Sequence, residues 1–211
     1  MKILKDYSLI ILGSFFMGLG IALTKCADLG LSTISSVPNV VSIKYDFLTL
    51  GTWSAIWNFV MIAAQILILG RNFKPEQFMQ IPVSFVMGWC TDFGVWLFTF
   101  IPAEFYFVKL IMTIIGVVVL GFGIALTVVA ARVMNPAEAI VKVVADKTKY
   151  DFGTMKIVFD VFCVVFAIVM SLIFFNFKIV GIREGTIIAI LGTGASIKFF
   201  VNCFNKISHK N

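Results

Sequence analysis

The sequence is poor in charged residues and in the side chains that most metal and cofactor sites require. Only 13% of its 211 residues are charged, roughly half the share found in soluble domains. Its one histidine, His209, is third from the C-terminus. The cysteines are too widely separated to form a zinc or redox motif; they are Cys26, Cys90, Cys163 and Cys203. We therefore expect neither a metal nor a cofactor.

Apolar residues, in contrast, are abundant and fall in long runs. They make up 60% of the chain, and the mean hydropathy is +1.03. A helix needs about 20 apolar residues to cross the hydrocarbon core of a bilayer. Runs of about this length predict six spans, at residues 7–27, 52–70, 78–101, 105–131, 153–175 and 185–204. We therefore expect an all-α integral membrane protein that has the lipid bilayer as a partner.

Two classes of function do not fit these residues. The net charge is +6, but the basic residues lie mostly between apolar runs, not in a basic and aromatic patch on a polar domain. We therefore expect no nucleic-acid partner. The sequence also has no nucleophile and base pair, no HExxH motif and no phosphate-binding loop. An enzyme is therefore not expected.

The distribution of basic residues predicts how the spans are oriented. With the N-terminus inside, the inner segments hold eleven lysines and arginines: Lys2, Lys5, Arg71, Lys74, Arg132, Lys142, Lys147, Lys149, Lys156, Lys206 and Lys210. The outer segments hold five: Lys25, Lys44, Lys109, Lys178 and Arg183. Because cytoplasmic loops carry the excess of positive charge, we expect both termini in the cytoplasm.

A pattern of glycines occurs twice, 103 residues apart. Gly13 and the segment GLGIALT at residues 18–24 recur as Gly116 and GFGIALT at residues 121–127. With a small shift in the offset, YDF at 45–47 also recurs at 150–152. This predicts two repeats of three spans each, residues 1–103 and 104–211. An odd number of spans reverses the second copy, giving the inverted repeat of many secondary transporters, whose solute site lies between the halves. The alternative is that the glycines only allow close helix packing.

Each repeat also contains a segment too short and too polar to span the bilayer, at residues 32–44 and 135–147. The second begins with Asn135, Pro136 and Glu138, which are typical of a helix N-terminus with a capping box, and Ser32 can cap the first. If both are re-entrant helices that begin in the interior, their N–H groups favour an anionic or carboxylate-bearing solute. The alternative is a pair of interfacial amphipathic helices.

Several short motifs carry a resemblance to a known family. They are Gly18-x-Gly20-x-Ala22-Leu23, the turn ADLGLS at residues 27–32, Leu50-Gly51-Thr52 and Gly88-x-x-x-Asp92. In these motifs the chain resembles the YczE/YyaS/YitT family of small bacterial membrane proteins. It departs from the family at Thr33, where a proline is expected, although Pro136 occupies the matching place in the second copy. The resemblance implies the bacterial inner membrane and a transporter role.

Three charged residues lie within the predicted spans and away from their ends, where an unpaired charge costs at least ~2.5–3.5 kcal/mol. They are Asp92, Asp160 and Lys198. Aligning Gly88 with Gly194 places Asp92 opposite Lys198, so we predict that these two side chains face one another in the bundle interior. A purely structural ion pair is one interpretation. A site for substrate or for a coupling ion is the other.

These observations predict a secondary transporter, a permease or an exporter, of a small organic solute, with an anionic one favoured. Asn58 joins the candidate site because it matches Asp160 in the repeat. The residues predicted to bind substrate or coupling ion are Asp92, Lys198, Asp160, Asn58, Ser32, Asn135 and Glu138. The alternatives are a channel, or a non-transporting membrane subunit that docks a soluble partner through the basic segment 142–156. A homodimer is compatible with the sequence.

Overall fold

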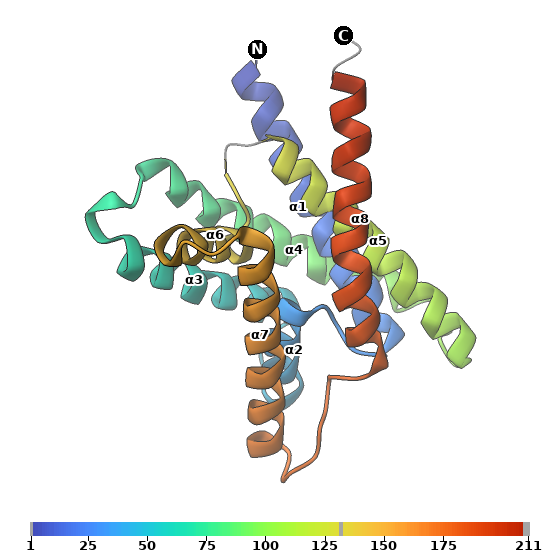
Figure 1. Cartoon of the computed structure of the whole chain (residues 1–211). Coiled ribbons are helices and arrows are strands. Elements are labelled where there is room, and N and C mark those ends of the chain that lie inside the picture. Colours follow the sequence, from blue (N-terminus) through green and yellow to red (C-terminus); the bar gives the residue numbers. More distant parts are fainter. Residues whose placement is uncertain (1, 131–132, 209–211) are drawn as a thin grey trace.

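The computed structural model describes residues 2–130 and 133–208, and all its regular elements in these ranges are helical (Figure 1). In order they are α1 (Lys2–Ala27), α2 (Thr33–Lys44), α3 (Leu50–Leu69), the short 3-10 turns η1 (Gly70–Asn72) and η2 (Pro75–Met79), α4 (Gln80–Phe98), α5 (Tyr106–Ala130), α6 (Pro136–Thr148), α7 (Phe152–Phe174) and α8 (Glu184–Ser208). The all-α expectation is confirmed. The order of helices is the same in each half: one long helix, then a short helix, then two long helices.

Six helices are long and apolar enough to cross a membrane, which confirms the number of predicted spans. They are Asp6–Ala27, Leu50–Asn72, Pro75–Phe98, Tyr106–Ala130, Phe152–Phe174 and Glu184–Lys206. These apolar helices indicate a multi-pass membrane protein. Ala131, the predicted end of the fourth span, lies outside the described residues, as do Arg132, His209 and Lys210.

The helices α1 and α5 cross at the centre of the molecule, where glycines bring their backbones together. A Cβ atom on Gly20 would lie 2.7 Å from the carbonyl oxygen of Gly116, and one on Gly13 would lie 2.7 Å from that of Gly123. Along α1 the contact moves from Gly13 to Gly20, while along α5 it moves back from Gly123 to Gly116. The two helices therefore run antiparallel, and the repeated glycines do allow close packing.

The other two long helices of each half are arranged differently. α4 packs on α1, where Gly18 meets Cys90, and α8 packs on α5, where Gly121 meets Ser196. α3 also packs along α4, but the described residues form no comparable interface between α7 and α8. In Figure 1, α3 and α4 lie side by side as a hairpin, whereas α7 and α8 diverge.

The two short helices pack across the halves: α2 packs on α7, and α6 packs on α3. Ser32 and Asn135 are their N-cap residues, as predicted, and Asn135 is followed by Pro136 at the first helical position. Neither N-cap side chain bonds a backbone N–H of its helix, so the predicted side-chain caps are wrong. The Ser32 hydroxyl donates instead to the Ser35 hydroxyl at 3.0 Å.

α3 and α7 each begin with a side-chain cap. Thr49 accepts the backbone N–H of Thr52 at 3.2 Å, and Asp151 accepts that of Thr154 at 2.8 Å. The ring of Phe174, at the end of α7, packs on Tyr45 just before α3. Side chains at the matched caps Thr49 and Asp151 therefore lie far apart.

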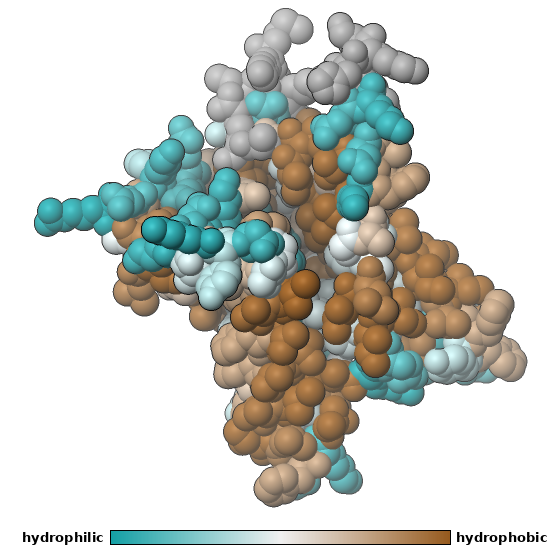
Figure 2. Space-filling view, viewed as in Figure 1, coloured by the Kyte–Doolittle hydropathy of each residue, from teal (hydrophilic) through white to brown (hydrophobic). Residues whose placement is uncertain are grey.

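Polar side chains gather at the ends of the spans and apolar ones between them. At one end, Asp28 lies 3.8 Å from Lys109 and 3.6 Å from Arg183, which joins the end of α1 to the starts of α5 and α8. Figure 2 shows continuous apolar surface along α7 and α5, between polar groups at the edges of the molecule. This distribution suits helices surrounded by lipid.

Candidate functional site

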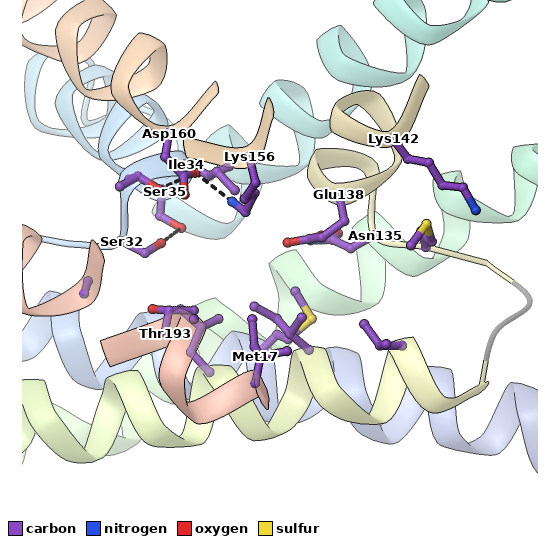
Figure 3. Close-up of a pocket in the computed structure, with 18 of the residues that line it drawn as sticks. Met17, Ser32, Ile34, Ser35, Asn135, Glu138, Lys142, Lys156, Asp160 and Thr193 are labelled. Atoms are coloured by element: carbon purple, nitrogen blue, oxygen red, sulfur yellow. Dashed lines mark hydrogen bonds and ion pairs between the residues drawn. The ribbon is translucent and has the colours of Figure 1, made fainter. Parts of the chain in front are cut away.

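A cavity of about 770 Å³ lies between the two halves, and all eight helices contribute to its wall. α1, α5 and α8 form one side, which is largely apolar; Met17, Ile21, Leu120 and Ile124 belong to it. α2, α3, α6 and α7 form the other side, which is polar (Figure 3). A cavity with one apolar and one polar wall suits a small solute that has both kinds of surface.

The polar wall contains an ion pair that joins α7 to α2. The ammonium group of Lys156 donates to Asp160 Oδ1 at 2.6 Å, one turn along α7. The hydroxyl of Thr33, the first residue of α2, donates to the same oxygen at 2.9 Å. Both charged side chains are largely buried, with 24% and 20% of their surface exposed. The pair holds the start of α2 against α7 at the cavity.

Glu138, in the first turn of α6, points into the cavity beside Asn135 (Figure 3). It is 6% exposed, and its Oε2 atom has no hydrogen-bond partner among the described residues. α6 is not one of the six apolar spans. Burial raises the pKa of the Glu138 carboxyl above its ordinary value of 4.5, opposed by the positive charge of Lys156 and by a hydrogen bond from Asn135. This carboxyl is therefore suited to carry a proton.

Three side chains of α3 also lack partners at the cavity. Asn58 is 3% exposed, and its Nδ2 atom makes no hydrogen bond within the part of the chain that the structure describes. The same holds for the hydroxyl of Ser54 and for the indole nitrogen of Trp57. Buried polar atoms normally have partners, and an unpaired one costs about 1–3 kcal/mol. Unused donors that line a cavity are available to a bound molecule.

The structure brings together six of the seven residues predicted for the site. Those that line the cavity are Lys198, Asp160, Asn58, Ser32, Asn135 and Glu138. Lys156 and Thr33 also belong to this site, and the sequence did not predict them. Lys156 lies four residues before Asp160 on one predicted helix. This spacing indicates an ion pair and could have identified Lys156.

The predicted pair of Asp92 and Lys198 is absent from the structure. Asp92 lies instead at the contact between α3 and α4, where its carboxylate accepts the backbone N–H of Gly51 at 2.8 Å and the hydroxyl of Thr49 at 2.6 Å. Lys198 lines the cavity and has no ion pair with any described residue. The prediction was wrong because correspondence in sequence between the two halves does not imply proximity in the folded protein.

Comparison with known proteins identifies the family. Residues 4–202 match a family of unknown function, DUF6198. The chain belongs to DUF6198. Neither the curated proteins nor the solved structures contain a match to it. Nothing in these comparisons assigns a function to DUF6198.

Proposed function

We propose that this DUF6198 protein is a secondary transporter that carries a small organic anion, together with a proton, through the cavity between its halves. The observation that carries the proposal is the cavity itself, with unpaired buried polar atoms of Asn58 and Glu138 facing an apolar wall. A structural core would leave such atoms paired. Transporters place their sites at this location, between two halves.

The central helix crossing supports an inverted repeat. Adding 103 to Gly13 gives Gly116, and subtracting 103 from Gly123 gives Gly20, so the offset converts the Gly13–Gly123 contact into the Gly116–Gly20 contact. A twofold axis that exchanges two antiparallel helices is perpendicular to both. If α1 and α5 cross the membrane, this axis lies in the membrane plane, as in inverted-topology transporters.

The short helices support an anionic solute. Their first residues line the cavity, through Ser32 and Ser35 of α2 and through Asn135 and Glu138 of α6, which suits re-entrant helices. The first backbone N–H groups of a helix have no partner within it, and the helix dipole adds partial positive charge there. Two such ends converge on one cavity that also contains unpaired Asn58. This arrangement favours a carboxylate or another small anion.

The charges at the cavity support coupling to a proton. Three lysines (Lys142, Lys156 and Lys198) and three acids (Glu138, Asp146 and Asp160) line it. These charges cancel when every acid is ionised and sum to +1 when Glu138 is protonated. Protonation of Glu138 therefore gives the cavity a net positive charge, which favours binding of a monoanion. Around Glu138, α7 contributes Lys156 and Asp160, whereas α3 contributes the uncharged Asn58 to the cavity wall and Gln65, which donates to the carbonyl of Pro136 at the start of α6.

Uptake by purified protein in liposomes tests the proposal. A thermal-shift screen of small carboxylates first selects solutes that stabilise the protein. The selected solute should then accumulate when a proton gradient is imposed, with a rate that saturates. Asn58→Leu and Glu138→Gln should each abolish accumulation, while Glu76→Gln, on the exposed turn η2, should not. Non-saturating flux without dependence on the gradient would instead indicate a channel, and no flux with any stabilising solute would reject transport.

We also propose that the protein lies in the bacterial inner membrane with both termini in the cytoplasm. The resemblance to the YczE/YyaS/YitT family and the excess of basic residues at one end support this orientation. In a cysteine-free background, single cysteines at Lys44 and Lys178 should react with an impermeant reagent added to intact cells. A cysteine at Lys147 should not react. Labelling of the Lys147 position from outside would reject the orientation.

A further inference from the structure

The closed interface between α3 and α4 is built from two glycines and one carboxylate. A Cβ atom on Gly51 would collide with the carbonyl oxygen of Gly88, and one on Gly88 would lie 2.6 Å from that of Gly51. The two helices therefore touch through their backbones. Asp92 secures the contact by accepting the N–H of Gly51 and the hydroxyl of Thr49, the N-cap of α3.

The second half carries the same glycines without the contact. Gly153 and Gly194 correspond to Gly51 and Gly88, but a Cβ atom on Gly194 would meet nothing within 4 Å, and one on Gly153 would meet only Asp151. A glycine inside a helix costs about 1 kcal/mol relative to alanine. Nothing packed against Gly194 in this conformation requires its small size.

The polar residues at this position also correspond, but their charges differ. The N-cap of α3 is the neutral Thr49 and the facing residue of α4 is the acidic Asp92. The N-cap of α7 is the acidic Asp151, and the residue of α8 that corresponds to Asp92 is Lys198. The hydroxyl and backbone N–H of Thr154 lower the pKa of Asp151, so this carboxylate is ionised at neutral pH. Lys198 is exposed and makes no ion pair with the described residues.

We propose that α7 and α8 close against each other at Gly153 and Gly194 in a second conformation, in which Lys198 pairs with Asp151. This ion pair would hold α8 against α7, as the hydrogen bonds of Asp92 hold α4 against α3. Closure would cover the cavity from the α7–α8 side, because Lys198 lines it and Phe152, next to Asp151, does too. The inference rests on the repeat within the proposed function, but it requires no knowledge of the solute.

Disulfide trapping tests this closure. Asp151→Cys and Lys198→Cys are combined in a protein whose four native cysteines are replaced by alanine, and the variant is oxidised in lipid nanodiscs. We expect an intramolecular disulfide between the two positions. The pair Thr49→Cys and Asp92→Cys serves as the positive control, because these side chains already touch. A disulfide in the control without one between positions 151 and 198 would overturn the proposal.

A second substitution separates closure from random motion of the helices. Gly194→Leu adds a side chain where nothing lies within 4 Å in this structure, so the protein should fold with an unchanged melting temperature. It should nevertheless prevent the 151–198 disulfide, because leucine would obstruct the approach of α7. An unchanged yield of disulfide in Gly194→Leu would show that the helices do not meet at this glycine, and would overturn the proposed contact.

The outcome is distinguishable from that of the transport assay. A disulfide that forms and is blocked by Gly194→Leu, in a protein that moves no solute, would support closure and reject transport. Solute uptake by a protein that forms no disulfide would support transport and reject closure. Because oxidation in nanodiscs requires no solute, neither result depends on the other.

Discussion

The hairpin of α3 and α4 and the pair α7 and α8 are built from corresponding sequence, yet one is closed and the other is open. Gly51 and Gly88 are in backbone contact, whereas Gly194 has no neighbour within 4 Å. The α1–α4 and α5–α8 interfaces, in contrast, correspond closely, through Gly18 with Cys90 and Gly121 with Ser196. The two halves therefore differ at one interface each, α3–α4 in the first and α7–α8 in the second. Residues of these helices line the cavity. Two similar halves in different arrangements are what alternating access requires.

Leucine at the corresponding glycines should have unequal effects on stability. Gly51→Leu places a side chain against the backbone of α4, and overpacking of this kind typically costs about 1–3 kcal/mol or more. Gly194→Leu should change stability little in this conformation, since its side chain meets no neighbour and leucine favours the helix. Thermal unfolding in detergent should show a lower melting temperature for Gly51→Leu alone. Equal losses for both variants would mean that α7 and α8 are already in contact.

Removal of the charge of Asp160 should have the next largest effect. Asp160→Asn leaves the largely buried Lys156 without its counter-charge, and loss of one partner in such a pair should cost about 1–3 kcal/mol, given its partial exposure. Replacing Lys156 by methionine in the same protein should restore much of that stability. A double-mutant cycle of chemical denaturation measures this coupling. Additive losses would contradict the ion pair.

Stability should depend on pH through Glu138. Its folded pKa is raised by burial, so the folded protein binds this proton more tightly than the unfolded chain does. The melting temperature should therefore fall as the pH rises from the unfolded pKa of 4.5 through the raised folded pKa, and then level off. Glu138→Gln should remove this part of the pH dependence, while Glu76→Gln on η2 should retain it. An identical pH profile for wild type and Glu138→Gln would contradict a buried, ionising carboxyl.

Lys198→Gln should have the smallest effect on stability. In this conformation Lys198 is exposed and has no ion pair among the described residues, so the melting temperature should be unchanged within error. Transport should still be slowed, because the second conformation loses its pair with Asp151. Uptake assays and thermal unfolding of one preparation separate these effects. A large loss of stability would indicate a partner for Lys198 in this conformation and would weaken the proposed closure.

The sequence predicted the features that depend on local composition. Apolar runs are sufficient to locate spans, and Ser32 and Asn135 were recognised as N-cap positions because their neighbours favour helix starts. The side-chain caps were wrong because capping competes with other partners: Ser32 donates to Ser35 instead. Such a choice depends on the side chains that surround a helix end in the folded protein.

The features that depend on the arrangement of the halves were not predictable from sequence alone. Alignment of Asp92 with Lys198 is a correspondence between halves, and the structure places Asp92 beside Gly51, on α3 of its own half. The open α7–α8 interface also could not be predicted, because Gly153 and Gly194 correspond in sequence to Gly51 and Gly88, which do touch. A repeat in sequence predicts equivalent parts, but not whether they adopt the same conformation.

The distance across α3 and α4, measured while α7 and α8 are held closed, tests most directly whether the two sides alternate. Spin labels on ketone-bearing amino acids at Phe47 and Trp96, which are 70% and 61% exposed, can report this distance before and after oxidation of the cysteine pair at positions 151 and 198. If the two sides alternate, the disulfide should lengthen the Phe47–Trp96 distance, and reduction should reverse the change. An unchanged distance in the disulfide-bonded protein would show that the two sides move independently and would contradict the account.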